Sequence, residues 1–589
     1  MKHRWIPREI DDDADVEQLR RDLNDLPEAL ARSLACRGVT SLEAAERYFR
    51  PSKDDLHNPL LMQDMATAAE RLGRAIEQGE RVLVYGDYDV DGTTATALMT
   101  HFLREQGADA RYFVPDRIEH GYGLCEAGID HAAAEGASLI VALDCGVTAH
   151  KQAAYAREQG LDLIICDHHT PPDELPDALA VLDPKRPDDP YPFGELSGCG
   201  VGFKLVQATL NSLGLPPERA EAYLDLVAIA TAADIVPLHG ENRILLSTGL
   251  DRLRRKKPRT GVRTLAETAG LDLPDVNVGR LVFGIAPRIN AAGRLGSAER
   301  AVALLLAEDE GRAREWAEEL EQTNRERQSI DRDTEREAAE RARRYLTARD
   351  DRRSVVLHDE NWHPGVVGIV ASSLVDEFHR PTILLTTVNG TVKGSARSIT
   401  GINIYDAIST CEDLLTEFGG HDHAAGLSLP EENLPAFKEC FNEAVNEALD
   451  GRMELMRPAV KVDAPLNLDE VGGMEDRFWA VLRQFAPFGP ANHKPVFVGR
   501  GLELADRPRT VGSDDKHLKF RVRQRNGRTA NGKGLDVIGF GKAEEHLSKL
   551  QESHRDGTPF EMLFSIEENT YRGRTNLQLK LRDLRLQEA

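Results

Sequence analysis

The sequence has 589 residues, of which 41% are hydrophobic and 6% aromatic, values typical of globular proteins. A chain of this length exceeds what one hydrophobic core usually supports, so several domains are expected. No apolar run reaches the length of a membrane span, and the N-terminal residues lack the apolar core of a signal peptide. These features exclude an integral membrane protein and predict a cytoplasmic one.

The net charge of -24 argues against a polyanionic partner for the chain as a whole. The charge is unevenly distributed, however. Residues 500–589 carry 18 Lys and Arg against 14 Asp and Glu, whereas the preceding residues are strongly acidic. A basic tail on an acidic body is compatible with nucleic-acid binding, with a solvated surface of mixed sign as the alternative.

The N-terminal part alternates between strand and helix patterns. Segments with helical spacing, such as residues 94–107, separate four short apolar runs, at 81–86, 138–144, 161–167 and 179–183. This alternation of strands and helices predicts a parallel sheet covered by helices on both faces. The highly charged segment 308–346 has no Pro and only Gly311 as a glycine, and it predicts one long, exposed connecting helix.

Two further units follow this helix. Candidate strands at 354–359 and 381–386 indicate a second α/β unit, and beyond residue 458 the sequence becomes rich in strand patterns, at 495–507, 516–526, 535–541, 560–569 and 575–586. Five such runs fit a small barrel of the OB type. The fold class is therefore α/β, with a parallel-sheet domain, a connecting helix, a smaller α/β domain and a terminal barrel, at 1–307, 308–346, 347–455 and 456–589.

The seven cysteines are odd in number and scattered, and none forms a CxxC pair. Neither a disulfide framework nor a thiolate zinc site is indicated. We expect all seven to be reduced and mostly buried.

Acidic and imidazole side chains follow the predicted parallel strands. Asp87, Asp89 and Asp91 come after the first strand, in "VYGDYDVDG", without a Lys or Arg among them. A calcium-binding EF-hand loop would need Glu at its twelfth position, where this chain has Leu98. The other strands also end in such residues, namely Asp144, Asp167, His168, His169 and Asp183. Because the carboxyl ends of adjacent parallel strands meet at one crevice, we expect these groups to converge there, rather than to form a solvated acidic turn.

So many carboxylates in one crevice require a counter-charge. Oxygen-rich sites with one or two imidazoles suit Mg²⁺ or Mn²⁺. A pair of such ions activates water for in-line attack on phosphorus, so the pattern predicts a metal-dependent phosphoesterase. The alternative is a nucleotide-binding α/β domain without catalysis, but "GDYDVDG" is not the G-x-G-x-x-G loop of dinucleotide-binding folds.

At this level of detail the chain resembles the DHH phosphoesterase superfamily. "GDYDVDGTTA", "ALDCG", "CDHH" and "AADIVPL" are similar to its four successive motifs, and "WHPGVVGIVASSL", "KGSARS" and "FGGHDHAAG" are similar to its associated second domain. With the connecting helix, the "INAAGRLG" segment and the barrel, the order resembles the branch of bacterial single-strand-specific exonucleases.

The resemblance implies a role for each matching position. The implied metal ligands are Asp89, Asp91, Asp144, His168 and Asp234, with Asp144 bridging two ions. The implied catalytic residues are His169 beside the scissile phosphate, Asp87 as an additional acid and Asp167 as the group that orients the histidines. Some members of the superfamily have a histidine where this chain has Tyr85, which implies a first ion held by fewer protein ligands.

The resemblance also implies substrate contacts, including a terminal 5′ phosphate, at Arg117, Arg294, Ser395, Arg397 and His421. Guanidinium groups form bidentate bonds with phosphate, which suits this role. The alternative for a single arginine is an ion pair, for example between Arg397 and Asp406.

The implied function is a metal-dependent 5′ to 3′ exonuclease that hydrolyses single-stranded DNA to 5′ mononucleotides in recombination and repair, using two Mn²⁺ or Mg²⁺ ions. A monomer is expected, with single-strand-binding protein and a RecQ-type helicase as partners. Phe488, Phe497 and Phe520 are candidates for base stacking, with barrel core as the alternative. The rival functions are a phosphodiesterase of short oligonucleotides or cyclic dinucleotides, and a non-catalytic replication scaffold of the same fold.

Overall fold

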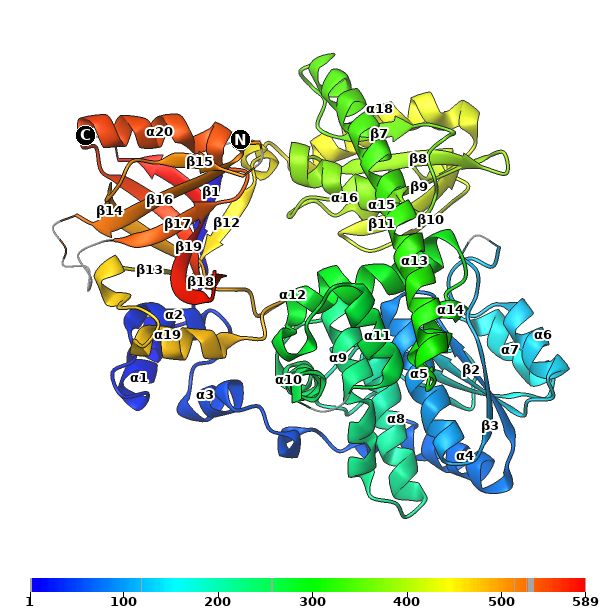
Figure 1. The fold of residues 1–589 in the computed structure, drawn as a ribbon. Coiled ribbons are helices and arrows are strands. Elements are labelled where there is room, and N and C mark those ends of the chain that lie inside the picture. The colour runs from blue at the N-terminus through cyan, green and yellow to red at the C-terminus, as the bar shows by residue number, and fades with distance from the viewer. Residues whose placement is uncertain are drawn as a thin grey trace. The chain divides into compact units, whose positions relative to one another are not determined.

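The computed structural model describes residues 3–117, 119–255, 258–512, 514–525, 527 and 534–587. They form two compact units (Figure 1). Unit 1 contains residues 57–234 and 249–458, and unit 2 contains the described parts of 3–56, 235–248 and 459–589. The predicted first domain, 1–307, differs from this division, because residues 3–56 and 235–248 pack in unit 2. Among the described helices, none combines the length and apolar character needed to span a membrane.

A parallel five-stranded sheet forms the centre of the first half of unit 1. Its strand order is β3-β2-β4-β5-β6, formed by Asp109–Phe113, Arg81–Gly86, Leu139–Leu143, Asp162–Cys166 and Ala180–Leu182. The four strands predicted from the sequence are confirmed, and β3 was missed. Strands β3 and β4, the next two strands along the chain, lie on opposite sides of β2. The direction in which strands are added therefore reverses at β2, and a topological switch point lies between β2 and β4.

Helices cover this sheet and connect it to the second half of unit 1. The helices that matter for the site are α5 (Val90–Glu105), α8 (Gly198–Ser212), α9 (Leu224–Ala233) and α13 (Ala286–Leu295). The connecting helix α15 spans Glu310–Thr347, within two residues of the prediction at each end. Its buried residues are mainly small, including Ala313, Ala317 and Ala338, as expected for a largely exposed helix with one packed stripe.

The second half of unit 1 is a mixed sheet flanked by helices α16 (Val367–Phe378) and α18 (Leu434–Leu449). The sheet order is β10-β11-β9-β8-β7, formed by Glu417–Gly420, Ala424–Leu429, Thr391–Arg397, Thr382–Val388 and Val355–His358. The two predicted strands correspond to β7 and β8.

The prediction that all cysteines are reduced is wrong for one pair. Cys411 follows helix α17 (Ile404–Ser409), Cys440 lies on α18, and a disulfide joins them across a Cα–Cα distance of 6.1 Å. The pairing depends on the packing of α17 against α18, which a sequence separation of 29 residues does not reveal. The other five cysteines are free thiols.

Unit 2 contains the predicted barrel. The five predicted strands correspond to β14, β16, β17, β18 and β19, at Phe497–Leu504, His517–Gln524, Leu535–Gly539, Phe560–Tyr571 and Arg574–Leu586. They pair in the order β14-β18-β19-β17-β16, and β16 pairs with β14 to close the barrel. Helix α20 (Ala543–Asp556) connects β17 to β18. Asn526, the last residue of the predicted second strand, lies outside the described residues.

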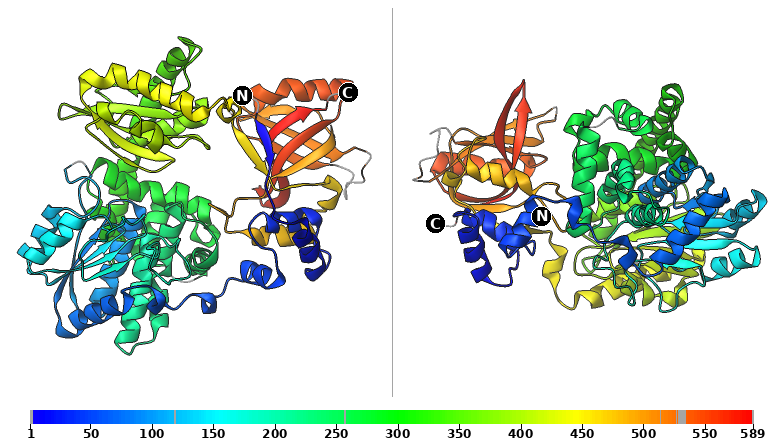
Figure 2. Two further views of the ribbon diagram at one scale, coloured as in Figure 1. Left: turned by 180° about the vertical axis from the view of Figure 1, so that it is seen from behind. Right: turned by 90° about the horizontal axis from the view of Figure 1, so that it is seen from below.

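The core of unit 2 is shared by distant segments of the chain. Helices α1 (Asp13–Asp22), α2 (Glu28–Ala35) and α3 (Leu42–Phe49) pack against the barrel core, which contains Phe497 and Phe520. These two phenylalanines are therefore core residues, and Phe488 is a partly buried neighbour of the core. Strand β1 (Arg4–Pro7) pairs with β12 (Ala459–Val462), and Figure 2 shows the N-terminal segments beside the C-terminal domain in both views.

Candidate functional site

The site begins where three neighbouring strands end. Gly86, Leu143 and Cys166 are register partners across β2, β4 and β5. The residue after each of them is an aspartate, so Asp87, Asp144 and Asp167 emerge side by side at the carboxyl edge of the sheet. This edge is where open parallel sheets bind their ligands.

The predicted metal ligands converge at this edge as two adjoining groups. Ligand atoms of Asp87, Asp89 and Asp144 lie within 4.8 Å of one another, and so do those of Asp91, His168 and Asp234. His168 Nε2 lies 3.2 Å from Asp144 Oδ1 and 3.5 Å from Asp234 Oδ2, so Asp144 and His168 connect the groups. Asp87, predicted as an additional acid, therefore has the same placement as the predicted ligands.

A tight helix start holds the first group. Asp89 is the N-cap of α5, and its carboxylate accepts a hydrogen bond from the Gly92 amide at 3.1 Å. A Cβ at Gly92 would lie 2.5 Å from the backbone oxygen of Asp87, so a glycine is needed for the turn to fold back on itself.

The start of helix α8 fixes Asp91. The amides of Gly198 and Cys199 donate to its two carboxylate oxygens at 2.6 and 2.9 Å. A helix N-terminus stabilises a negative charge at this position. This contribution was not predicted from the sequence, although the run Ser197-Gly198-Cys199-Gly200, with a capping serine and two glycines, marks the helix start.

The electrostatics of the cluster favour a bound cation. Burial, followed by repulsion from neighbouring aspartates, raises the pKa values of Asp144 and Asp234 well above the ordinary range, and raises the pKa of Asp91 to about 7. Burial and the nearby His169 lower the pKa of His168 to about 3, which keeps its imidazole neutral.

Several of these buried atoms also have no hydrogen-bond partner among the described residues. They are Oδ1 of Asp87, Oδ1 of Asp144, Oδ2 of Asp234 and both ring nitrogens of His168. Buried polar atoms normally find partners, so their absence needs an explanation. Carboxylate oxygens with one neutral imidazole are a donor set that suits Mg²⁺ or Mn²⁺, and the residues therefore fit divalent metal ions.

Asp167 anchors both histidines. Its Oδ1 accepts hydrogen bonds from the His168 amide at 2.8 Å and from His169 Nδ1 at 2.7 Å, and its Oδ2 accepts from the Val147 amide at 2.9 Å. Burial alone would raise the pKa of Asp167, but the hydrogen bond and charge of His169 lower it to about 2. Although burial opposes it, the same hydrogen bond raises the pKa of His169.

Two tyrosines of this region were not predicted as site residues. The Tyr122 hydroxyl lies 3.0 Å from His169 Nε2, and its side chain is 60% exposed. Tyr85 is fully buried, donates to the Gly123 carbonyl at 2.8 Å and accepts from the Cys125 amide at 3.2 Å. Tyr85 therefore fastens the loop that carries Tyr122. No sequence motif marked Tyr122, since its contact with His169 depends on the folding of this loop.

Four of the five predicted substrate residues share one electrostatic environment. Arg397 donates to Ser395 Oγ at 2.7 Å, and Arg294 donates to the Gly365 carbonyl at 3.0 Å. The guanidinium of Arg117 lies 5.4 Å from the Tyr88 ring centroid. Burial, followed by repulsion from Arg117, lowers the pKa of Arg294 to about 10 and also lowers that of Arg397. Such repelling cations are stabilised by a bound anion.

Helix α16 begins beside this group. A Cβ at Gly368 would lie 2.9 Å from Arg397 Nη2 and 3.0 Å from Ser395 Oγ. The helix has no side-chain N-cap, and the first amides of a helix have no acceptor within it. The cations and the start of α16 thus offer donors to one anion.

The fifth predicted substrate residue, His421, is separate from this group. Its side chain is 67% exposed, and its Nδ1 contacts Asp422 at 3.3 Å and the His423 amide at 3.2 Å. Within the described part of the chain, it forms no recorded contact with another predicted site residue.

Comparison with known proteins gives the same domain order. The model of the DHH family, N-terminal domain, matches residues 81–231, that of the DHHA1 domain matches 351–447, and that of the RecJ OB domain matches 462–583. The single-stranded-DNA-specific exonuclease RecJ of Bacillus subtilis is 38% identical, with 100% of this chain and 71% of the relative covered. The RecJ of Escherichia coli is 36% identical, with 97% of each chain covered.

The fold is also that of solved RecJ structures. The crystal structure of RecJ in complex with Mn²⁺ from Thermus thermophilus is similar with a TM-score of 0.80 and 30% identity, over 100% of this chain and 80% of that chain. The same protein in complex with Mg²⁺ gives a TM-score of 0.75. Matches of this extent in sequence and structure show that the chain belongs to the RecJ family of DHH phosphoesterases.

Proposed function

We propose that this protein is a metal-dependent exonuclease that degrades single-stranded DNA from the 5′ end to 5′ mononucleotides, in DNA recombination and repair. The observation that carries the proposal is the convergence of five aspartates and His168 at one edge of the sheet. Among the described residues, Asp87, Asp144, Asp234 and His168 each present a buried ligand atom without a hydrogen-bond partner. The relatives named above as single-stranded-DNA-specific exonucleases support the substrate. A scaffold that had lost catalysis would not need to keep so costly a cluster.

The residues divide into two ligand groups for two Mn²⁺ or Mg²⁺ ions. Asp87, Asp89 and Asp144 would hold one ion, and Asp91, His168 and Asp234 the other, with Asp144 placed to serve both. When bound, such ions activate water and stabilise the charge that develops at phosphorus. The amides at the start of α8 orient Asp91 for this role and partly oppose the burial that raises its pKa.

His169 acts on the phosphate in this proposal. Asp167 holds Nδ1, so the ring is fixed in orientation and Nε2 is left for the substrate. Since the pKa of His169 is raised, its protonated form is available to donate to a phosphate oxygen. In this proposal, the phosphate oxygen takes the place of the Tyr122 hydroxyl, which contacts His169 Nε2 in the structure.

In this proposal, the 5′ polarity comes from the three arginines Arg117, Arg294 and Arg397. A terminal phosphate carries more negative charge than an internal phosphodiester, so a site with three cations favours it. Arg397 with Ser395, Arg294, Arg117 and the first amides of α16 provide such a site. Anchoring that phosphate would place the adjacent phosphodiester at the metal centre. His421 remains a predicted substrate contact.

The wider proposal concerns location and partners. The barrel of unit 2 holds the single strand, the enzyme acts as a monomer in the cytoplasm, and single-strand-binding protein and a RecQ-type helicase are its partners. These points rest on the family resemblance and on the basic C-terminal region.

Polarity and substrate can be tested together. Identical single strands labelled at the 5′ or the 3′ end are digested in parallel with Mn²⁺, with a labelled duplex as the matched control. The expected result is immediate release of a labelled mononucleotide from the 5′-labelled strand, late release from the 3′-labelled strand and an intact duplex. Early release from the 3′ label would refute the polarity, and no release from any strand would refute the nuclease.

A further inference from the structure

One face of the barrel carries cations in rows. Leu518, Phe520 and Val522 on β16 point into the core, so the residues between them, Lys519 and Arg521, point outward. The same alternation places Ile538 on β17 and Lys580 on β19 on the outer side. Ile538 is the register partner of both Lys519 and Lys580, which therefore flank it in one row across three strands.

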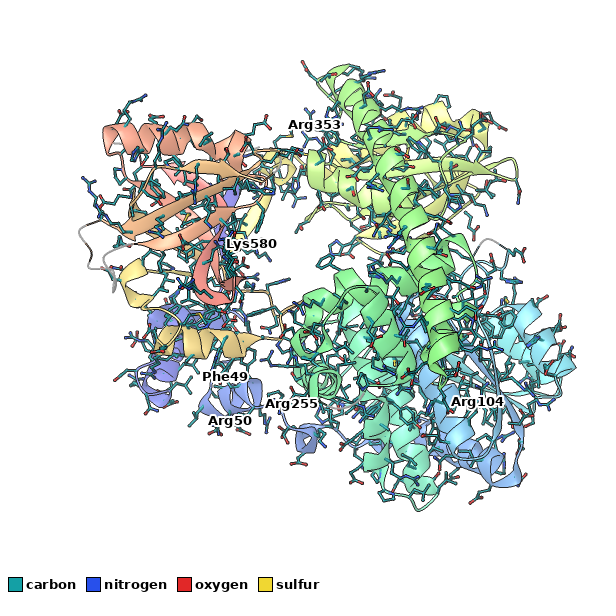
Figure 3. The ribbon with its side chains drawn as sticks, in the orientation of Figure 1. Phe49, Arg50, Arg104, Arg255, Arg353 and Lys580 are labelled. Atoms are coloured by element: carbon teal, nitrogen blue, oxygen red, sulfur yellow. A yellow bond between two sulfur atoms is a disulfide. The ribbon has the colours of Figure 1, made fainter. Side chains whose placement is uncertain are left out.

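Two cations of this face are not neutralised by the protein. Arg521 pairs with Asp536 at 3.1 Å, and Arg523 pairs with Glu503 at 2.6 Å. Lys519 and Lys580, in contrast, have no ion-pair partner in the part of the chain that the structure describes. Lys580, labelled in Figure 3, instead lies with its Nζ 5.4 Å from the ring centroid of Phe540. A chain with a net charge of -24 thus keeps two lysines on this face that no described carboxylate pairs with, and one of them, Lys580, lies beside an aromatic ring.

Phe540 is held outward by a tight turn. It follows β17 and lies between Gly539 and Gly541, and Gly541 has a φ of 65°, a conformation that favours glycine. The Gly541 amide donates to His517 Nδ1 at 3.0 Å, and the His517 ring packs edge-on against Phe540 with centroids 5.4 Å apart. Despite these contacts, the Phe540 side chain is 53% exposed, so an apolar ring is fixed at the surface.

We infer that Phe540 is a stacking platform for a base of single-stranded DNA, with Lys519 and Lys580 binding the phosphates on either side. This inference rests on the proposed function and names a subsite for its substrate. An aromatic ring offers a face to any base, and neighbouring cations contact the backbone, which is the chemistry of sequence-independent single-strand binding. The outer face of the second and third barrel strands, here β16 and β17, is where OB folds bind oligonucleotides. The inference replaces Phe497 and Phe520, which are buried, as the stacking residues.

The test uses the full-length protein with EDTA, so that no strand is cut. Binding of an oligothymidylate is compared with binding of a strand of equal length made of abasic residues, which has the same charge and no bases. The wild type should prefer the thymidylate strand. Phe540→Ala should reduce this preference at least about fivefold, and Phe540→Trp should retain it, because an indole also stacks. Thermal melts of each variant report its folding.

Three matched variants separate stacking from charge and from general damage. Tyr571→Ala removes a second exposed aromatic residue of the barrel, which is 66% exposed, and should leave the preference unchanged. Lys519→Gln and Lys580→Gln should weaken binding to both strands equally and reduce the slope of log affinity against log salt by about one each.

Two results would overturn the inference: a base preference that survives in Phe540→Ala, or a folded wild type with no base preference. Digestion with Mn²⁺ on the same preparations keeps the two proposals distinguishable. If the wild type hydrolyses 5′-phosphorylated strands while Phe540→Ala keeps the base preference, only the stacking platform fails. If the wild type hydrolyses no strand, the proposed nuclease fails, whatever the binding data show.

Discussion

Gly198 lies directly against Asp144. A Cβ at position 198 would come within 2.7 Å of Asp144 Oδ1 and within 2.8 Å of its Cα. Asp144 itself has a φ of 62°, a left-handed conformation that a non-glycine residue adopts at a cost. The start of helix α8 therefore holds both Asp91, through its amides, and Asp144, through close packing.

The first prediction follows from this contact. Gly198→Ala should push Asp144 away from His168 and lower kcat about 100-fold, since a displacement near 1 Å at reacting groups has this effect. Gly200→Ala, on the same helix, is the control, because its added Cβ would meet its nearest atom at 3.4 Å, an ordinary contact. Steady-state hydrolysis of a 5′-phosphorylated strand and thermal melts are measured for both. Equal activity of the two variants would contradict the packing argument.

The second prediction concerns Asp144, the residue that connects the two ligand groups. Asp144→Asn should reduce hydrolysis to less than about a tenth of the wild-type rate, because the metal contribution to the barrier is several kcal/mol. The same change should raise the melting temperature in EDTA, since it removes one of several buried like charges. It should also shrink the stabilisation that Mn²⁺ gives. A metal-free variant less stable than the wild type would argue against the repulsion inferred for this cluster.

The third prediction is that the stability of the metal-free protein and its affinity for Mn²⁺ change in opposite directions as the pH rises. The pKa of Asp91 is raised from 3.8 to about 7, so the folded metal-free protein binds protons more tightly than the unfolded chain. That contribution to stability is fully present below pH 3.8 and is lost as the pH rises through about 7. The melting temperature in EDTA should therefore fall between pH 6 and pH 8. Mn²⁺ affinity should rise over the same range, because the ion competes with the proton. Calorimetry at pH 6 and at pH 8 measures the melting temperature in EDTA and the Mn²⁺ affinity. The proposal would be contradicted if both quantities rose, or both fell, between these two pH values.

The sequence predicted the site where local patterns determine the structure. The strands β2, β4, β5 and β6 were found because each is a short apolar run, and the ligands after them because strand ends converge in a parallel sheet. Strand β3 was missed because its sequence, Asp109–Phe113, contains the charged residues Asp109 and Arg111 and no continuous apolar run.

The rest depends on contacts between distant segments. Residues 3–56 precede the parallel-sheet domain in sequence, yet Leu30 and Leu34 pack in the core that contains Phe497. Nothing in their helical pattern specifies which domain they join. The contacts of Tyr122 with His169, and of the α8 amides with Asp91, likewise join residues 47 and more than 100 positions apart. Periodicity describes which face of an element is buried, but not its partner.

The last prediction concerns Arg397, the residue on which the 5′ polarity depends most directly. Arg397 donates to Ser395 Oγ and to the Ala396 carbonyl, both at 2.7 Å, so the structure records backbone and hydroxyl partners for it rather than the carboxylate of Asp406. Loss of a charged bidentate contact typically costs a few kcal/mol. Arg397→Ala should therefore slow degradation of 5′-phosphorylated strands at least tenfold and shrink the preference for 5′-phosphate over 5′-hydroxyl ends. Arg380→Ala is the matched control, because Arg380 is also a partly buried arginine of the same sheet domain and binds backbone carbonyls. It should lower the melting temperature without changing the end preference. If Arg397→Ala behaves like Arg380→Ala, then Arg397 is a structural residue, and the terminal phosphate must be recognised elsewhere.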